Sequence, residues 1–406
     1  MNTVSAEQLP HSDLQYYPDL ARKRAAVQAV LARTGTPVFL CDSDIVADRY
    51  RAMDASLTGN WPAHVIGFSF KTNYQLAGTG ILQRAGAWAE VVSGREYRLA
   101  RALGYPGHSI IFNGPYKTDA DLRTAFAEGA LVNLNDHDEL DRVVAMGTAF
   151  AAPVAVGLRV ASTLPRLGHS RFGFSLENGE ALAAVEKLRR APGLQLVALH
   201  TNLYGDTDDP GIYSVAAGRL GEFAQRHLDA GGTALRYIDL GGGYPAHTPK
   251  PKSREQWEPQ EIGAYVQAIT AALGQHFPAA QPRPALILEP GRYLSADGIV
   301  LVTRVVHVKR RNDRQEINCN GSISMVPLTH YSPQVIRAWT EDLQQRRGPA
   351  APTVIFGATC RENDILYDGP FVEVRPGDFL VHYAVGAYNA NLGPDFIYEA
   401  PGLELI

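Results

Sequence analysis

Eight short apolar runs recur between residues 64 and 289, and more polar segments with a helical repeat separate them. Runs of this length that are apolar throughout are typical of parallel strands buried on both faces. This alternation predicts an α/β fold, a (β/α)8 barrel. An open, doubly wound sheet has the same alternation and remains the alternative. The runs occupy residues 64–70, 87–92, 109–114, 130–135, 153–160, 194–200, 234–240 and 285–289.

The polar segments predict the intervening helices. A further helix is expected to start at Ser93, because Ser93 and Glu96 have the spacing of a capping box, in which each side chain accepts the other's backbone N–H. Residues 12–34 predict an amphipathic helix that ends at Gly35, and Pro37–Cys41 predicts a strand. The helical repeats lie at residues 119–129, 138–147, 180–191 and 261–277.

The pattern changes after residue 291. Strand-like runs are now separated by turn residues such as those at 375–378, and the segment 310–315 predicts an exposed hairpin or loop. We therefore expect a barrel over residues 37–291 and an all-β domain over 292–406, with the N-terminal segment 1–36 packing on the β domain. The runs lie at residues 299–310, 353–357, 371–374 and 378–385.

Composition narrows the class of protein. The 406 residues contain 38 Lys and Arg against 42 Asp and Glu, a net charge of −4 without a basic tract, which argues against nucleic acid as a partner. No apolar run approaches the roughly 18 residues of a membrane span, and residues 1–15 lack a signal-peptide pattern. Cys41, Cys319 and Cys360 are too few for a disulfide or zinc framework, so no metal site is expected. We expect a soluble, cytoplasmic enzyme with a small-molecule substrate.

Reactive groups of a parallel barrel lie where its strands end. Lys71 follows the first barrel run, and desolvation there would lower its pKa and free a nucleophilic amine; the alternative is a solvated lysine. Gly241 to Gly243 follow the seventh run and could direct backbone N–H groups at a phosphate, or form a tight turn. Glu289 and Arg292 follow the eighth run, where they could also form a structural ion pair.

Together these groups match pyridoxal phosphate (PLP), an aldehyde cofactor with a phosphate and a ring nitrogen. Lys71 would hold the aldehyde, the glycines and Arg292 the phosphate, and Glu289 would keep the ring nitrogen protonated. A protonated ring is the electron sink that loss of CO2 or of a proton from Cα requires.

The motifs around these residues resemble the fold-type III PLP enzymes, in the branch of diaminopimelate, ornithine and arginine decarboxylases. The resemblance runs from Thr36 to Phe396 and implies a fold like that of alanine racemase and ornithine decarboxylase. The motifs stand in family order: FSFKTN (68–73), AEVVSGREYRLARALG (89–104), IIFNGPYKT (110–118), SRFGF (170–174), DLGGGYP (239–245), EPGR (289–292), CRENDIL (360–366) and GAYNAN (386–391).

The resemblance implies a role for each matching residue. Lys71 would form the Schiff base with PLP, and Glu289 would pair with the ring nitrogen. Arg159 would lie near the phenolic edge of the ring. Cys360 would enter the site of the second subunit of a homodimer and guide protonation of Cα after CO2 leaves. The phosphate would be bound by Gly241, Gly242, Gly243, Arg292 and Tyr388.

One segment departs from the family pattern His-x-His-x-Gly-Ser. His200 keeps the first position, Asn202 replaces the histidine that stacks on the cofactor, and Gly205 replaces the serine that binds phosphate. Tyr204 or Tyr213 would be the residues to compensate for the lost stacking. Glu90 replaces the aspartate of the family, a milder change.

A second departure concerns the substrate. The relatives carry an acid directly after the cysteine, where it meets a distal ammonium, but here Arg361 holds that position and Glu362 follows. Arg361 implies a substrate with an anionic or neutral far end. Alternatively Arg361 faces solvent, and Glu362 meets a basic substrate as in the diaminopimelate and ornithine enzymes. Two alternative functions remain: an amino-acid racemase and a catalytically silent PLP-fold protein that binds a partner.

Overall fold

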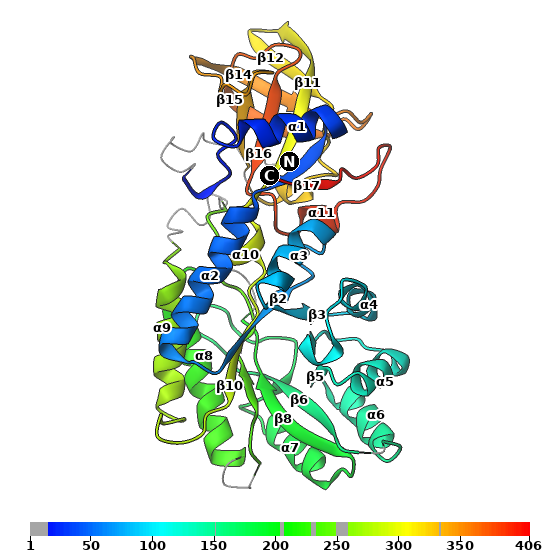
Figure 1. Cartoon of the computed structure of the whole chain (residues 1–406), viewed down its shortest axis with the longest axis vertical. Coiled ribbons are helices and arrows are strands. Elements are labelled where there is room, and N and C mark those ends of the chain that lie inside the picture. The colour runs from blue at the N-terminus through cyan, green and yellow to red at the C-terminus, as the bar shows by residue number, and fades with distance from the viewer. Residues whose placement is uncertain (1–14, 151, 204–206, 229–232, 249–258, 333) are drawn as a thin grey trace.

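The computed structural model describes residues 15–150, 152–203, 207–228, 233–248, 259–332 and 334–406. Figure 1 shows two units one above the other, a barrel of strands and helices below and an all-β domain above. The chain passes from the β domain into the barrel through α2 and returns through α10.

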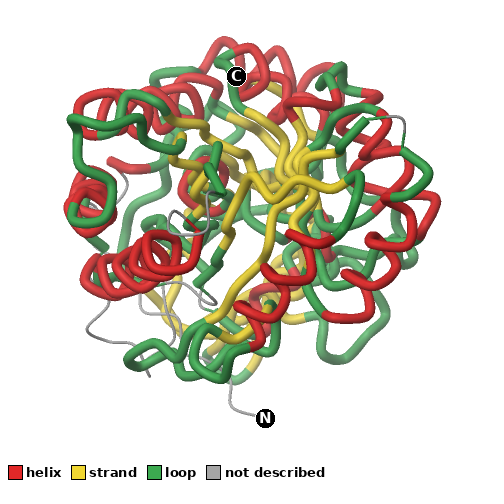
Figure 2. Tube along the Cα trace, turned by 90° about the horizontal axis from the view of Figure 1, so that it is seen from below, coloured by secondary structure: helices red, strands yellow, loops and turns green. Residues whose placement is uncertain are grey.

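The lower unit is a closed parallel barrel. Its strands pair in the order β5-β4-β3-β2-β10-β9-β8-β6, and pairing of β5 with β6 closes the ring. Seen from below, the strands gather at the centre and the helices surround them (Figure 2). All eight predicted runs form one barrel strand each, so the barrel is confirmed and the open sheet is wrong. The strands are β2 (His64–Ser69), β3 (Trp88–Val91), β4 (Ile110–Phe112), β5 (Leu131–Leu134), β6 (Val154–Ala161), β8 (Leu194–His200), β9 (Tyr237–Asp239) and β10 (Ala285–Leu288), with a short β7 (Phe174–Ser175) beside β6.

Helices follow the barrel strands, and each predicted helical repeat forms a helix. The N-terminal helix is shorter than predicted, because it begins at Arg24 and residues 1–14 lie outside the described chain. It ends where expected, at Gly35, which has a φ of 71°. Among the described helices, none has the length and hydrophobicity to span a bilayer. The helices are α1 (Arg24–Thr34), α2 (Ser43–Asn60), α3 (Leu76–Arg84), α4 (Gly94–Ala102), α5 (Asp119–Ala127), α6 (His137–Gly147), α7 (Glu180–Arg190), α8 (Pro210–Phe223), α9 (Ile262–Gly274), α10 (Arg292–Ser295) and α11 (Asn389–Leu392).

The capping box predicted at the start of α4 is half correct. Ser93 accepts from the backbone N–H of Glu96 at 3.2 Å, as expected. The carboxylate of Glu96, however, accepts from the N–H of Val92 at 2.8 Å instead of that of Ser93. The Glu96 carboxylate therefore binds the backbone one residue N-terminal to the position that the capping box predicts, at the junction between β3 and α4.

The barrel interior has an apolar lower layer and a polar upper layer. Ile111, Leu131, Ala198 and Ile287 form a buried apolar cluster. Because side chains two residues apart point to the same side of a strand, the residues two positions further on also face inward. Those residues are polar and buried, and together with the inward groups of the other strands they form the upper layer: Ser69, Glu90, Asn113, Asn133, Arg159, His200, Asp239 and Glu289.

The upper unit is a β domain that also includes the predicted strand near the N-terminus. β1 pairs with β11 and β17 of this sheet, so residues 38–41 belong to it and not to the barrel, where the boundary at residue 37 placed them. Val27 and Val30 of α1 lie in the core of this domain. The segment 310–315 is the predicted hairpin between β11 and β12. The strands are β1 (Val38–Cys41), β11 (Ile299–Arg311), β12 (Arg314–Cys319), β13 (Val335–Trp339), β14 (Ala350–Phe356), β15 (Ile365–Val372), β16 (Phe379–Tyr383) and β17 (Leu403–Leu405).

Candidate active site at the carboxyl ends of the barrel strands

Lys71 follows β2 and ends in a polar cluster. Its Nζ donates to Glu90 Oε2 at 2.5 Å and to Ser69 Oγ at 2.6 Å. Burial lowers the pKa of Lys71, but the nearby carboxylates of Glu90 and Glu289 outweigh that effect and leave the pKa raised. The lowered pKa expected from desolvation alone is therefore wrong, since the ion pair with Glu90 favours the protonated amine of Lys71.

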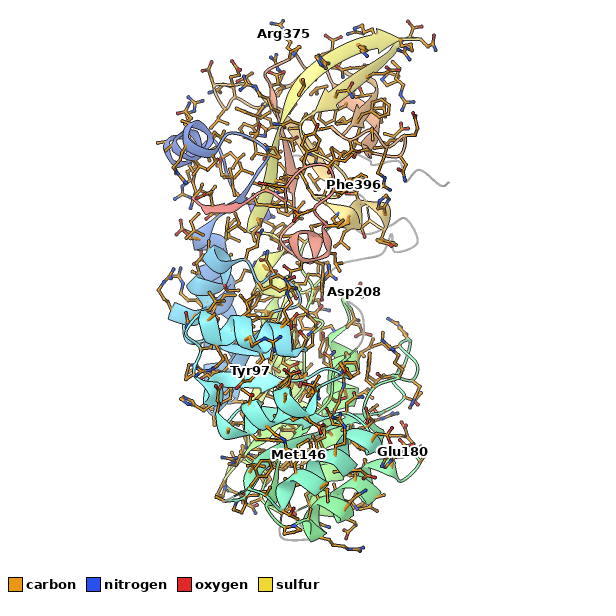
Figure 3. All side chains as sticks on the ribbon, turned by 90° about the vertical axis from the view of Figure 1, so that its right-hand side faces the viewer. Tyr97, Met146, Glu180, Asp208, Arg375 and Phe396 are labelled. Atoms are coloured by element: carbon orange, nitrogen blue, oxygen red, sulfur yellow. The ribbon has the colours of Figure 1, made fainter. Side chains whose placement is uncertain are left out.

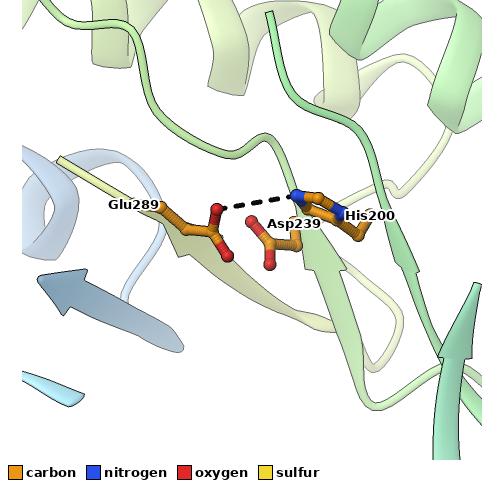
Figure 4. Close-up of side chains that lie close together, drawn as sticks. All are labelled: His200, Asp239 and Glu289. Carbon is orange, nitrogen blue, oxygen red and sulfur yellow. Dashed lines mark ion pairs between the residues drawn. The ribbon is translucent and has the colours of Figure 1, made fainter. Parts of the chain in front are cut away.

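Glu289 follows β10, the strand that pairs with β2, and its side chain is buried. Its Oε1 accepts from Asn113 Nδ2 at 2.7 Å, and its Oε2 lies 3.5 Å from Nε2 of His200 (Figure 4). Burial raises its pKa, but His200 and Lys71 more than compensate, so the pKa of Glu289 is lowered and it remains a carboxylate. Lys71 and Glu289 thus place an amine and a carboxylate on adjacent strands inside one cluster.

Asp239 and His200 complete this buried group. Burial and the neighbouring Glu289 raise the pKa of Asp239 well above its usual range, so it keeps its proton. Burial lowers the pKa of His200, and the charge of Glu289 opposes that effect. Neither ring nitrogen of His200 has a hydrogen-bond partner among the described residues. The ligand atoms of His200, Asp239 and Glu289 lie within 4.8 Å of one another, a donor set that could also hold a metal ion.

Arg159 lies at the end of β6, beside the end of β8. Its guanidinium is held over the ring of Phe172 at 4.7 Å, and Arg171 covers the same ring at 4.2 Å. Burial lowers the pKa of Arg159, and the charges of Glu289, Glu90 and Asp239 oppose that effect. Arg159 therefore shares the electrostatic environment of the cluster.

The glycine turn does not direct its three N–H groups at one point. Gly241 N–H donates to Asp239 Oδ1 at 2.8 Å, and Gly242 N–H donates to Asn202 Oδ1 at 2.8 Å. The turn does require glycine, because a Cβ on Gly242 would lie 2.5 Å from the carbonyl oxygen of Glu289. The expectation that all three amides face one anion is therefore wrong, because neighbouring side chains already satisfy two of them.

Asn202, at the position of the family's stacking histidine, binds the glycine turn through its side-chain amide. Tyr213, a predicted substitute, stacks on Tyr244 with ring centroids 4.9 Å apart, and its hydroxyl donates to the carbonyl of Gly242. Tyr204 and Gly205 lie outside the described residues.

Arg292 and Tyr388 meet at the junction of the two units. The Arg292 guanidinium lies 5.2 Å from the ring centre of Tyr388. Tyr388 adopts a positive φ of 65°, and its N–H donates to the carbonyl of Thr72, next to Lys71. The structure therefore brings both predicted phosphate ligands to the Lys71 side of the barrel mouth.

Cys360, Arg361 and Glu362 lie on an exposed loop between β14 and β15. Asp364 holds this loop by accepting from the N–H groups of Ile323 and Thr359. Among the described residues, no hydrogen bond or ion pair joins the three residues to the Lys71 cluster. The structure of a single chain therefore does not bring them into the site.

The prediction missed several members of the cluster. Asn113 donates to both Glu289 and Glu90, and Asn133 in turn donates to Asn113 at 2.8 Å. Ser69 and Asp239 are likewise absent from the predicted site, and the sequence identifies Glu90 only as a mild replacement of the family's aspartate. The signal that could have identified them is the alternation itself, since each stands two residues after an inward apolar or small side chain of its strand.

The donor set fits PLP in most respects. Lys71 offers an amine for the aldehyde, Glu289 a carboxylate for the ring nitrogen, and Arg292 a guanidinium for the phosphate. The orphaned nitrogens of His200 show that the buried cluster can accept a further hydrogen-bonding partner. The glycine turn fits less well, because Asn202 occupies Gly242 N–H.

Comparisons with known proteins agree with this chemistry. Residues 44–296 match the family model described as pyridoxal-dependent decarboxylase, pyridoxal binding domain. A diaminopimelate decarboxylase of Actinosynnema pretiosum is 29% identical over 379 residues, which cover 90% of this chain and 82% of the relative. One from Pseudomonas fluorescens is 27% identical over 392 residues, which cover 93% of this chain and 89% of that protein.

Solved structures share the fold. Diaminopimelate decarboxylase from M. jannaschii, in complex with L-lysine, has a TM-score of 0.83 at 20% identity and covers 94% of this chain and 89% of its own. Lysine/ornithine decarboxylase from Vibrio vulnificus, complexed with putrescine, has a TM-score of 0.78 at 21% identity. The match covers 95% of this chain and 98% of the Vibrio chain. The family match spans more than half of the chain. This chain therefore belongs to the pyridoxal-dependent decarboxylases, and its barrel is their pyridoxal-binding domain.

Proposed function

We propose that the enzyme binds PLP through Lys71 and removes the α-carboxylate of an amino acid. The observation that carries this proposal is that Lys71 and Glu289 follow the adjacent strands β2 and β10 and belong to one polar cluster, linked through Glu90 and Asn113. When bound, PLP supplies an electron sink for the electrons left on Cα as CO2 departs.

Each residue of the cluster has a defined task in this proposal. Lys71 is the amine that holds the cofactor's aldehyde, and Glu289, kept ionised by His200, holds a proton on the ring nitrogen. Asn113 fixes the orientation of the Glu289 carboxylate through a 2.7 Å hydrogen bond. Arg159 supplies positive charge beside the cofactor ring. The phosphate is bound by Gly243, Arg292 and Tyr388, with Asn202 holding the adjacent Gly241–Gly242 turn.

We further propose that the enzyme is a homodimer and that Cys360 completes the partner's site by delivering a proton to Cα. The exposure of the Cys360 loop supports this proposal, because a catalytic thiol on the surface of one chain needs a second chain to enclose it. Large exposed apolar residues lie in the same domain and offer area for such a contact: Leu392, Phe396, Ile397 and Tyr398. Three free thiols favour a reducing compartment, and we propose the cytoplasm.

The proposed substrate has an anionic or neutral far end. Arg361 is exposed, its guanidinium lies 5.7 Å from the ring centre of Phe396, and no carboxylate among the described residues forms an ion pair with it. Figure 3 shows Phe396 on the β-domain side of the junction with the barrel. A guanidinium held by a ring keeps its donors free for a carboxylate. The alternative, a basic substrate that binds Glu362, is favoured by the relatives, which are diaminopimelate and lysine/ornithine decarboxylases.

A panel of amino acids tests both substrate classes. Purified protein with PLP is incubated with basic members (lysine, ornithine, diaminopimelate) and acidic ones (glutamate and carboxylated conjugates of diaminopropionate), and amine products are measured by mass spectrometry. We expect products from acidic members, and Arg361→Ala should raise their KM at least about tenfold. Arg375→Ala is the control, since Arg375 is exposed at the far end of the β domain (Figure 3). If only the basic members are turned over, the proposed decarboxylase activity still holds, but the proposed role of Arg361 is refuted.

Binding of PLP separates an enzyme from a silent relative. Lys71→Ala should abolish the visible absorbance of the PLP-loaded protein, whereas the exposed Lys309→Ala should retain it. Unchanged absorbance of the Lys71 variant would refute the assignment of Lys71.

A further inference from the structure

The ion pair at Lys71 poses a problem for cofactor capture. An ammonium has no lone pair and cannot attack an aldehyde, so Lys71 must lose a proton before it reacts. The contacts of its Nζ show where that proton can go. The Oε2 of Glu90 lies 2.5 Å away, and Glu90 is the one carboxylate within ion-pair distance of Nζ among the described residues.

Glu90 is held in place for this contact. It lies at the end of β3, next to β2, and is only 1% exposed. Asn113 donates to its Oε1 at 3.1 Å, and the Ser69 hydroxyl donates to the same Oε2 that meets Lys71. The carboxylate therefore has one oxygen anchored to Asn113, and the other is shared between Ser69 and Lys71.

We propose that Glu90 is the proton acceptor and donor for Lys71 when the lysine bonds to the cofactor. This inference rests on the proposed function. The Lys71 ammonium gives one proton to Glu90 Oε2, and the freed amine forms a C–N bond to the aldehyde carbon. The second proton on the nitrogen moves to the aldehyde oxygen, and Glu90 returns its own proton to that oxygen, which leaves as water. The nitrogen keeps one proton, the C=N bond forms, and Glu90 is a carboxylate again.

The proposal makes a prediction opposite to that of a purely structural ion pair. If Glu90 only held Lys71 in place, Glu90→Gln would remove the charge that keeps the amine protonated, and PLP capture would become faster. If Glu90 accepts the proton, the same variant has no acceptor in contact with Nζ, and capture becomes slower. The two roles therefore differ in the sign of the change.

The experiment measures the rate at which cofactor-free protein acquires visible absorbance after mixing with PLP. We expect Glu90→Gln to slow this rate on the order of 100-fold, the usual contribution of a positioned proton-transfer group. Glu90→Asp, which keeps a carboxylate, should stay within about tenfold of the wild type. In Glu90→Ala, added formate should restore the rate in proportion to its concentration, because a small carboxylate can enter the space of the lost side chain.

Controls separate the possible failures. Thermal unfolding shows whether each variant folds, and Glu341→Gln provides a carboxylate change on the surface of the β domain. A Glu90→Gln protein that captures PLP as fast as the wild type, or faster, overturns the inference and leaves the proposed function intact. The proposed function itself fails if the wild-type protein acquires no absorbance with PLP.

Discussion

Asp239 and Glu289 hold two buried carboxyl groups close together at the barrel mouth, and their pKa values are shifted in opposite directions (Figure 4). Asp239 keeps its proton because burial and the adjacent negative charge both raise its pKa. Glu289 stays ionised because His200 and Lys71 stabilise its charge. The environment thus gives two chemically similar groups different tasks.

The opposite pKa shifts of Asp239 and Glu289 predict unequal effects of two amide substitutions. Asp239→Asn keeps a neutral hydrogen-bond donor at this position, so PLP binding and kcat should remain within about threefold of the wild type. Glu289→Gln removes the charge that holds the proton on the cofactor ring, so kcat should fall on the order of 100-fold. Kinetics of both variants, with bound PLP measured by absorbance, check this difference. Equal losses in the two variants would contradict the division of tasks.

The contact between Asn202 and Gly242 predicts how tightly PLP binds. Asn202→Ala leaves the Gly242 N–H without its partner and loosens the turn, at a cost of about 1–3 kcal/mol. The Kd for PLP should therefore rise about tenfold or more, as measured by fluorescence titration. Asn178→Ala is a matched control, since Asn178 also accepts from a backbone N–H, that of Glu180, but on the exposed start of α7. If the Asn202 variant binds PLP as tightly as the wild type, Asn202 does not maintain the turn.

Glu96 makes stability depend on pH. Burial raises its pKa to about 7 from 4.5, although the Val92 N–H partly offsets the effect. Between these values the folded protein keeps a proton that the unfolded chain has lost, so this group's contribution to stability falls as pH rises from 4.5 to 7. Glu96→Gln stays neutral and avoids that loss. Its free energy of unfolding relative to the wild type should increase from pH 4 to pH 8 by on the order of 2–3 kcal/mol.

Denaturant unfolding at several pH values measures this difference. Glu399→Gln is the control, because Glu399 is exposed in the folded chain and should give no comparable trend. A constant difference between Glu96→Gln and the wild type would show that Glu96 is ionised throughout this range.

The proposed shared site predicts complementation between two inactive variants. Lys71→Ala and Cys360→Ala each lack one component, and a mixed dimer contains one site with both components intact. Co-refolding equal amounts should therefore recover about a quarter of the wild-type activity, since about half of the dimers are mixed and each has one working site. No recovery, with mixed dimers confirmed by mass spectrometry, would mean that Cys360 does not act across subunits.

The barrel could be predicted from the sequence because strands buried on both faces are apolar throughout. Each therefore appears in the sequence as a short apolar run. Lys71 and Glu289 could be found for the same reason, since each follows the end of a recognisable run. The alternation also held the information for Asn113 and Asp239, but only once the inward face of each strand was known.

Other features depend on distances between distant segments. The charge of Lys71 is set by Glu90, which belongs to the next strand, so local desolvation gave the wrong direction. Asn202 binds Gly242, 40 residues further along, and no spacing rule indicates that contact. The apolar sequence of Val38–Cys41 is compatible with a strand in the barrel and with a strand in the β domain. Its partner β11 lies more than 250 residues further along the chain.

Breaking of the bond from Cα to the carboxylate is the step that distinguishes a decarboxylase from a racemase. The most direct measurement is incubation of the PLP-loaded protein in D2O with the amino-acid panel, with CO2 loss and deuterium uptake followed separately by mass spectrometry. We expect an amine that has lost CO2 and carries one deuterium at the former Cα. An amino acid that keeps its carboxylate and gains deuterium at Cα would identify a racemase and rule out decarboxylation as the reaction.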